Sequence, residues 1–445
     1  MKKLILITIV FLSLFCGAQA QVIVTAAGNG IAGYSGDGLL AVDAELRLPQ
    51  GVVLDDSGNL YICDVNNGCI RKVSPGYGGI ITTIAGTGTP GYNGNHALGI
   101  YTQLNGAYDV AIDHNGNVYI PDAGNNCIWK VNPADSIFMI AGTSIAGYNG
   151  DGIPATAAQV NSPIGIAVDI IGNVFFIDAY NYRIRRIDTN GIITTIAGTG
   201  VAGFSPDGSQ ADTVKLDLIG SIRIDKSGNL FFTDNVRVRK IDSAGIITTI
   251  AGNGIIGYSG DSGMATSAEI GGSAIAIDSA GDIFIADGSS SNRVRMVNTA
   301  GFIYTIAGNG IGGYSGDNID PLLAHICAPT GVAVNNMGEI YIGDMCNNRV
   351  RLVTMHPLDA NKRITTPDDV TIFPNPCDQY FNIQVNQAID EMAEVSVSNI
   401  VGEIVSKLQM KTNKPVTVPA NWPPGVYIIN ATTKLRQYNV KVFVR

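Results

Sequence analysis

The stretch that decides the fold is GVVLDDSGNLYICDVNNGCIRKV, residues 51–73, which consists of three short apolar runs separated by turn segments. The runs are rich in β-branched and aromatic residues, and the segments DDSGN and DVNNG have the Asp, Asn and Gly content of tight turns. A fourth run, GIITTIAG, follows at residues 79–86. The pattern predicts a unit of four antiparallel strands.

This unit recurs along the chain. Its second run ends on an aspartate in every copy, at Asp64, Asp122, Asp178, Asp234, Asp287 and Asp344. The Ile-Ala-Gly of the fourth run returns at 84–86, 140–142, 196–198, 250–252 and 306–308, with a degenerate Ala-Ala-Gly at 26–28, so that copies lie 54 to 58 residues apart. Four strands per repeat and six repeats predict an all-β chain folded as a six-bladed β-propeller.

The order of the runs predicts how the ring closes. No copy of the fourth run follows Val353, whereas an extra run, residues 22–26, precedes the first complete unit. We therefore expect this N-terminal strand to pair with the strand at 349–354. Such pairing removes two free sheet edges, which would otherwise invite aggregation.

The repeat resembles the NHL-repeat family. The segments that carry the resemblance are GIAVD at 165–169, NVFFID at 173–178 and NYRI at 181–184. The resemblance covers about residues 22–355 and implies a propeller in which these segments form the inner three strands of a blade. The long segments of the type AGNG…GYSGDG look like those of large bacterial surface proteins and of the teneurin propeller.

The two ends of the chain differ from the repeats. Residues 1–20 have Lys2 and Lys3, an apolar run and a final Ala-Gln-Ala, the pattern of a secretory signal peptide cleaved after Ala20. Acylation at Cys16 is the disfavoured alternative, because the bulky Phe15 precedes it. No later segment reaches the roughly 20 apolar residues of a membrane-spanning helix. The sequence thus predicts an exported protein.

Beyond the repeats, residues 356–366 form a polar linker and residues 367–445 alternate like a small β-sandwich. FPNP at 373–376, GVYII at 425–429 and the final YNVKVFVR at 438–445 resemble the C-terminal sorting domain of the type IX secretion system. The resemblance implies that the type IX machinery is a partner of residues 367–445. It also implies an extracellular or outer-surface location, either released or attached.

Composition narrows the ligand classes. The formal net charge is −9 and dense Lys/Arg patches are missing, so nucleic acid is not an expected partner. The four histidines lie at unrelated positions of the repeat, which makes a zinc site improbable, and no cofactor motif is present. We expect no metal and no cofactor.

One aromatic residue recurs in every long loop: Tyr34, Tyr92, Tyr148, Phe204, Tyr258 and Tyr314. Two interpretations stay open. The rings offer stacking platforms for a glycan or peptide, or they wedge between neighbouring blades. A ligand-binding role would make the protein a binding or adhesion module with an unknown protein or glycan ligand.

Other loop residues have structural explanations. We expect the loop aspartates to cap short turns rather than to bind calcium, which takes six to eight oxygens; they are Asp37, Asp151, Asp207, Asp261 and Asp317, with Asn95 in the second copy. Asp64 with Asn67 suggests an Asx turn. Arg183, Arg293 and Arg349 are interpreted as members of ion pairs.

The alternative function is a hydrolase or lyase acting at the central channel. Aligned inner strands place Gln50, Tyr108, Ile164, Gly220, Ser273 and Thr330 at one level. Asp109 and Arg223 break the apolar pattern there, but they form no cluster of carboxylates or histidines. No catalytic residue is assigned.

Six cysteines follow the signal peptide, and an exported chain can oxidise them. Cys327 precedes the inner strand of the last repeat, and Cys346 follows its second strand. Antiparallel geometry returns both to the same end of the sheet. We therefore predict a disulfide between Cys327 and Cys346, with two free thiols as the alternative.

Overall fold

A computed structural model describes residues 21–76, 79–94, 97–217, 219–354, 363–364, 370–373, 380–385, 392–399, 404–420, 422–423, 425–432 and 436–444. The predicted signal peptide, most of the predicted linker, Asn95 and Cys377 lie outside these residues.

The repeats form six antiparallel sheets, which we call blades 1 to 6 in chain order. Blade 1 is β2 (Pro49–Leu54), β3 (Leu60–Asp64), β4 (Cys69–Val73) and β5 (Ile81–Gly86). Blade 2 is β6 (Ala111–Ile112), β7 (Val118–Asp122), β8 (Cys127–Val131) and β9 (Ile137–Ala141). Blade 3 is β11 (Pro163–Val168), β12 (Val174–Asp178), β13 (Arg183–Ile187) and β14 (Ile192–Ala197), with β10 (Ile153–Pro154) added at its edge.

The remaining sheets follow the same order. Blade 4 is β15 (Ile219–Ile224), β16 (Leu230–Asp234), β17 (Val238–Ile241) and β18 (Ile247–Ala251). Blade 5 is β19 (Ala274–Ile277), β20 (Ile283–Asp287), β21 (Arg293–Val297) and β22 (Ile303–Ala307). Blade 6 is β23 (Pro329–Val334), β24 (Ile340–Asp344), β25 (Arg349–Thr354) and β1 (Val22–Ala27).

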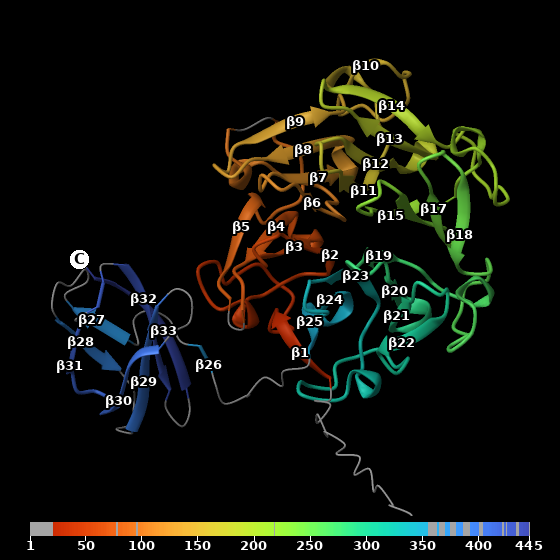
Figure 1. The fold of residues 1–445 in the computed structure, drawn as a ribbon. Coiled ribbons are helices and arrows are strands. Elements are labelled where there is room, and N and C mark those ends of the chain that lie inside the picture. Colours follow the sequence, from red (N-terminus) through yellow and green to blue (C-terminus); the bar gives the residue numbers. More distant parts are fainter. Residues whose placement is uncertain are drawn as a thin grey trace, which may run out of the picture.

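Figure 1 shows the first strand of each blade near a common centre and the last strand at the periphery. The second strands are almost entirely buried, because each of their faces packs against a neighbouring sheet. Apolar clusters therefore form between blades; one cluster joins Tyr61 and Ile70 of blade 1 to Val118 and Trp129 of blade 2.

The N-terminal strand takes the place that the sequence predicts. β1 pairs antiparallel with β25, with Ile23 opposite Val353 and Val24 opposite Leu352. The outer edge of the last sheet is thus supplied by the first strand of the chain.

The long loops cover the outer edges of other blades through short stretches of pairing. The long loop before blade 3 returns as β10 and pairs with β14, and single bridges join Leu40 to Ile80, Gln210 to Ile246 and Met264 to Phe302 in the same manner. The long loops also contain 3₁₀ turns: η1 (Ala41–Asp43), η3 (Gly99–Tyr101), η5 (Ala155–Ala157), η7 (Ala211–Thr213), η8 (Ala265–Ser267) and η9 (Pro321–Leu323).

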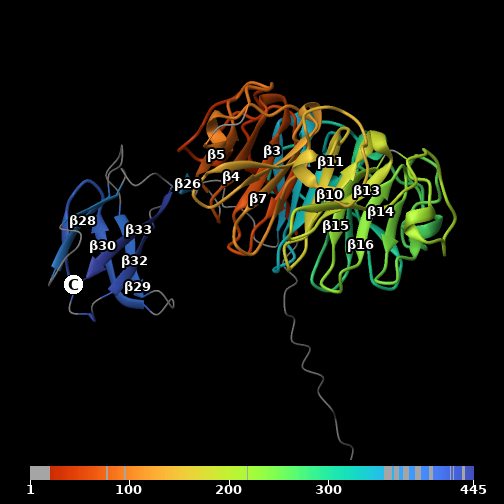
Figure 2. The same cartoon turned by 90° about the horizontal axis from the view of Figure 1, so that it is seen from above.

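Strand alternation sorts the connections onto two faces, and Figure 2 shows the strands running between them. One face, the loop face, carries the long loops and the turns between second and third strands. These turns are η2 (Val65–Asn67), η4 (Ala123–Asn125), η6 (Ala179–Asn181), α1 (Gly288–Ser291) and η10 (Met345–Asn347). The opposite face, the turn face, carries tight turns such as residues 55–59 and 113–117.

The C-terminal region forms two further sheets. One contains β26 (Arg363–Ile364), β33 (Arg436–Val444), β32 (Gly425–Thr432), β29 (Met392–Asn399) and β30 (Ile404–Lys411), and the other contains β27 (Val370–Phe373), β28 (Tyr380–Val385) and β31 (Val416–Pro419). The two sheets bury one core, which includes Phe381, Val395 and Ile429.

The C-terminal sheet includes a two-residue strand from the predicted linker. Arg363 and Ile364, placed in the linker by sequence, pair parallel with Arg436 and Gln437 of the last strand. Backbone hydrogen bonding thus extends the C-terminal sheet into the polar segment, whose composition gives no sign of a strand.

Candidate binding surface on the loop face

A buried aspartate ends the second strand of each blade. In blade 3 the Asp178 carboxylate accepts hydrogen bonds from the backbone N–H of Asn161 at 2.7 Å, from the Asn181 amide at 2.8 Å and from Arg185 at 3.1 Å. Asn67 donates to Asp64 in the same way at 2.8 Å. The Asx turn expected at Asp64 is not formed, because the Asp64 side chain does not cap η2 and Asn66 N–H donates to the Arg47 carbonyl instead. The Asp64 carboxylate also anchors the preceding long loop by accepting from Arg47 N–H.

A fully buried arginine joins this aspartate to the loop above it in five blades. Arg185 also donates to the loop residue Asp151 at 2.8 Å and to the Gly150 carbonyl at 2.9 Å. The equivalent pairs are Arg71 with Asp37, Arg239 with Asp207, Arg295 with Asp261 and Arg351 with Asp317.

The expectation that the loop aspartates cap short turns is therefore wrong. No side-chain cap is present at η1, η5, η7 or η8. η9 is capped by Asp320, whose carboxylate accepts from Leu322 N–H. The loop aspartates instead offset the charge of a buried guanidinium, which has a larger need for a negative partner than a solvated turn has.

The recurring aromatic rings stack on arginines of the next blade. Tyr148 lies 4.0 Å from the Arg183 guanidinium carbon and 4.8 Å from that of Arg185. Phe204 contacts Arg237 and Arg239, Tyr258 contacts Arg293 and Arg295, and Tyr314 contacts Arg349 and Arg351 in the same way. In these four loops the aromatic ring thus packs the loop against the blade.

The rings are nevertheless half-exposed. The exposed fraction is 41% for Tyr34, 49% for Tyr92, 38% for Tyr148, 50% for Phe204, 39% for Tyr258 and 41% for Tyr314. The structure therefore places all six predicted residues at the surface of the loop face. Part of each ring packs against the protein, and the rest is accessible to solvent.

The arginines that begin the third strands, Arg183, Arg293 and Arg349, are called the outer arginines here, and they form no ion pair with any residue that the structure describes. Arg183 donates to the carbonyls of Asn181 at 2.8 Å and Thr199 at 3.0 Å, and Arg293 and Arg349 repeat this pattern. Each guanidinium group lies over the aromatic ring, and its N–H groups donate to backbone carbonyls, which ties the loop to the strand.

Blades 1 and 2 depart from the pattern. Cys69 and Cys127 stand where the outer arginine lies elsewhere, and Trp129 replaces the buried arginine. The Trp129 indole N–H donates to Asp122 at 3.0 Å. Burial raises the pKa of Asp122 to about 6.

Sequence reasoning missed an exposed aliphatic residue at the tip of the long loops. Asn29 accepts from the backbone N–H of Ile31 at 2.8 Å, and Asn253 and Asn309 do the same for Ile255 and Ile311. The exposed fractions are 60% for Ile31, 60% for Ile145, 50% for Val201, 57% for Ile255, 65% for Ile256 and 57% for Ile311. The recurrence of an apolar residue three places before five of the six aromatics, all except Tyr92, was the available signal.

The centre of the ring is tightly packed. A Cβ atom on Gly51 would lie 2.5 Å from the Tyr108 carbonyl oxygen, and one on Gly331 would overlap the Gln50 carbonyl. Asp109 of the second repeat and Arg223 of the fourth form a bidentate ion pair at 2.7 and 3.0 Å. Asp109 and Arg223, the two residues that break the apolar pattern of the inner strands, thus neutralise each other across the centre.

The structure brings the predicted cysteine pair together as thiols. Cys346 N–H donates to the Cys327 carbonyl at 3.3 Å. Burial and a hydrogen bond with Cys346 raise the pKa of the Cys327 thiol to about 12.

We predict that these thiols oxidise to a disulfide in the exported protein. The bond would close a loop of about 19 residues and stabilise the fold by roughly 3 kcal/mol, because it restricts the unfolded chain. Non-reducing peptide mapping of the secreted protein should recover Cys327 linked to Cys346, whereas buried Cys63 serves as the free-thiol control. Recovery of both alkylated residues would contradict the prediction.

Among the described residues, no three His, Cys, Asp or Glu side chains converge in a way that could hold a metal ion. Over the same residues, no helix has the length and apolar character needed to cross a membrane.

Family models match both parts of the chain. Residues 46–73 and 327–351 match the NHL repeat, residues 145–202 match the teneurin NHL domain, and residues 371–445 match the secretion system C-terminal sorting domain. NHL repeats are thus found in the first part of the chain and a C-terminal sorting domain in the last part.

Curated relatives extend the similarity to most of the repeats. Teneurin-1 of Gallus gallus is 28% identical over 414 residues, and teneurin-4 of Mus musculus is 28% identical over 408 residues. These alignments cover 81% and 82% of this chain, which spans only 15% and 14% of the length of those relatives.

Solved structures share the fold at low identity. A structural genomics protein of unknown function from Bacteroides thetaiotaomicron has a TM-score of 0.56 at 16% identity, with 75% of this chain and 76% of that chain covered. An auxiliary nutrient binding protein from the same organism has a TM-score of 0.54 at 15% identity, with the same coverage of both chains.

Proposed function

We propose that this protein is an exported binding protein, in which a closed six-bladed propeller presents its loop face to a protein or glycan ligand. The observation that carries the proposal is the repeated exposure of an aliphatic tip beside a half-exposed aromatic ring. Isolated exposed apolar residues are common on protein surfaces, but their recurrence at one position of successive loops on one face is typical of an interaction surface.

Two contacts support a closed ring. β1 completes the last blade by pairing with β25. The inner strand of blade 6 lies against that of blade 1, since Gly331 and Gly343 both face the Gln50 carbonyl at a separation that leaves no room for a side chain. The first and last blades therefore touch.

The centre favours binding at the loops over catalysis in a channel. Arg223 and Asp109 are 16% and 7% exposed and already satisfy each other's charge. A hydrolase or lyase at this place would need a free acid, base or nucleophile, and this pair would have to separate first.

The binding proposal is tested with the mature chain, residues 21–445, on glycan and peptide arrays. Ile255→Ser with Ile256→Ser should weaken array binding about tenfold, the scale expected when two exposed apolar contacts are lost. The matched control is Ile170→Ser with Ile171→Ser, which changes two residues of the turn face with exposed fractions of 78% and 69%. Equal effects of the two double variants, or no array ligand at all, would overturn the proposal.

We further propose that residues 363–445 direct export and fold independently of the propeller. A sorting-domain match and a separate apolar core support this.

Deletion of residues 363–445 should leave a cooperatively folded propeller that stays in the periplasm. The two tryptophans report on one part each, since Trp129 is buried in the propeller and Trp422 packs on the C-terminal core. Loss of the Trp129 unfolding transition in the truncated protein would contradict independence.

A further inference from the structure

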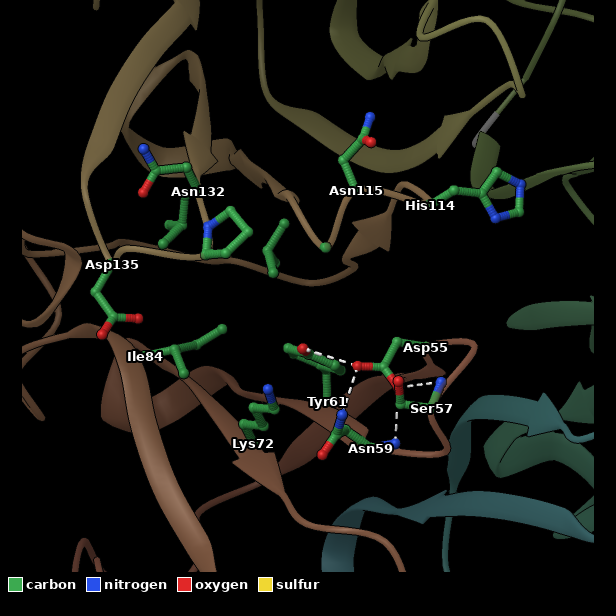
Figure 3. A pocket seen from close by; sticks show the side chains of 14 residues that line it. Asp55, Ser57, Asn59, Tyr61, Lys72, Ile84, His114, Asn115, Asn132 and Asp135 are labelled. Atoms are coloured by element: carbon green, nitrogen blue, oxygen red, sulfur yellow. Dashed lines mark hydrogen bonds between the residues drawn. The ribbon is translucent and has the colours of Figure 1, made fainter.

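A polar cleft of about 380 Å³ lies between blades 1 and 2 on the turn face, opposite to the proposed ligand surface. Figure 3 shows that blade 1 forms one wall, with Lys72, Asp55 and Ser57, and blade 2 forms the other, with Asp135 and His114. At its edge, His114 Nδ1 lies 2.6 Å from the Asp56 carboxylate, so that a polar contact joins the turns of the two blades.

The floor of the cleft is a rigid turn. Asp55 accepts from the Asn59 amide at 2.7 Å, from the Tyr61 hydroxyl at 3.2 Å and from the backbone N–H groups of residues 57 and 59. Asp113 holds the corresponding turn of blade 2 in the same way. These bonds are structural, and they fix one carboxylate and one hydroxyl in the floor.

Two charged side chains on the walls are not engaged in this way. The Lys72 ammonium lies over the Tyr61 ring, 5.3 Å from its centroid, and makes no ion pair with any described residue. The Asp135 carboxylate has neither a hydrogen bond nor an ion pair within the described part of the chain, and Figure 3 shows it directed across the cleft toward blade 1. A donor and an acceptor therefore stand free on facing walls.

Asp135 occupies a backbone position that favours glycine. Its φ is 60°, and its N–H donates to the Asn132 carbonyl in the turn between third and fourth strands. The same turn in blades 3, 4 and 5 places Gly191, Gly245 and Gly301 at φ values of 76°, 76° and 83°. Blade 2 thus carries a carboxylate in a left-handed conformation that costs an L-residue on the order of 1 kcal/mol. Strain of this kind concentrates at functional sites.

We propose that this cleft binds a neutral saccharide. Sugar hydroxyls both donate and accept, which matches a free ammonium, a free carboxylate and the amides of Asn115 and Asn132 that also line the cleft. Pro133 and the partly buried Ile84 offer apolar surface to the C–H groups of a sugar ring. Two carboxylates, Asp55 and Asp135, and one ammonium group, Lys72, line the cleft, which disfavours an anionic ligand. The Asp55 carboxylate is already held by the hydrogen bonds of its own turn.

The experiment uses the mature full chain and saturation-transfer NMR with glucose, galactose, maltose and lactose, each at about 10 mM because single-site sugar affinities are often near millimolar. Glucose 6-phosphate and diglycine are the arms that test anionic and zwitterionic ligands. Asp135→Gly restores the residue of the other blades, so it should not destabilise the fold, yet it should weaken sugar binding about tenfold or more.

A matched control separates local effects from general ones. Lys72→Ala should weaken sugar binding, whereas Lys130→Ala removes the same stacking on Tyr119, also at 5.3 Å, without touching the cleft. No sugar signal from the wild type, unchanged binding by Asp135→Gly, or a preference for glucose 6-phosphate or diglycine would each overturn the proposal.

This inference rests on the proposed binding function but concerns a different face. Ile255→Ser with Ile256→Ser should leave sugar binding at the cleft unchanged. Failure of the loop-face proposal would therefore appear on the arrays, and failure of the cleft proposal would appear only in the sugar titrations.

Discussion

Replacement of Asp178 by Asn is expected to lower the free energy of unfolding by about 3–5 kcal/mol, the cost of leaving a buried charge without its partner. The Arg185 side chain is fully buried and its Nε has no hydrogen-bond partner. Its charge depends on Asp178 and on Asp151, and only Asp178 is itself buried. Urea unfolding followed by circular dichroism measures the loss.

The same substitution in blade 2 is the control. Asp122 faces the Trp129 indole rather than an arginine. Asp122→Asn therefore loses hydrogen bonds but leaves no buried cation without a partner. We expect it to cost about 1–3 kcal/mol. Asp151→Asn should cost less than Asp178→Asn, because Asp151 is 36% exposed and solvent screens its charge. An Asp178→Asn variant no less stable than Asp122→Asn would contradict the assigned role of the buried pair.

We expect removal of β1 to lower the free energy of unfolding more than any other short deletion. Ile23 packs in the cluster that joins blades 5 and 6, and Ala27 packs in the cluster that joins blades 6 and 1. Ile23 and Val24 are completely buried, and each contributes about 1.5–3 kcal/mol through burial. The deletion also removes the backbone hydrogen bonds between β1 and β25. The free energy of unfolding of a mature chain without residues 21–27 should therefore fall by at least about 5 kcal/mol, which is comparable with the whole stability of many domains.

The freed edge of β25 should also promote association, because it presents unpaired backbone groups. Light scattering and thermal melting would compare the deletion with Val22→Ala, which changes a partly exposed residue of the same strand. A synthetic peptide of residues 21–27 should restore part of the stability when added in trans. A monomeric deletion variant that melts like the parent chain would show that β1 does not complete the last blade.

Much of the fold follows from the repeat. The recurring strand and turn segments specify where each sheet begins, and the surplus strand at 22–26 predicts the observed pairing with β25. The sequence was less informative where strand pairing depends on backbone hydrogen bonds alone. Arg363 and Ile364 are an example, because they lie in a polar segment without the apolar alternation that predicts a strand.

The candidate site was predicted only in part. The six loop aromatics could be identified by their recurrence, and they lie on the loop face. Their stacking partners could not, since Arg183 and Arg185 belong to a strand of the following blade, and sequence spacing does not show how far a loop leans onto that blade. The loop aspartates were misassigned for the same reason.

The strand order, the turns and the apolar faces could be read from the amino-acid sequence. These features depend on residues that are neighbours along the chain or that repeat at a fixed interval. Which charges meet became known from the folded chain, as in the pairs of Arg185 with Asp151, 34 residues apart, and of Arg223 with Asp109, 114 residues apart. Those contacts, and the cleft between Lys72 and Asp135, depend on the packing angle between successive sheets, which burial of the whole core sets and no single segment specifies.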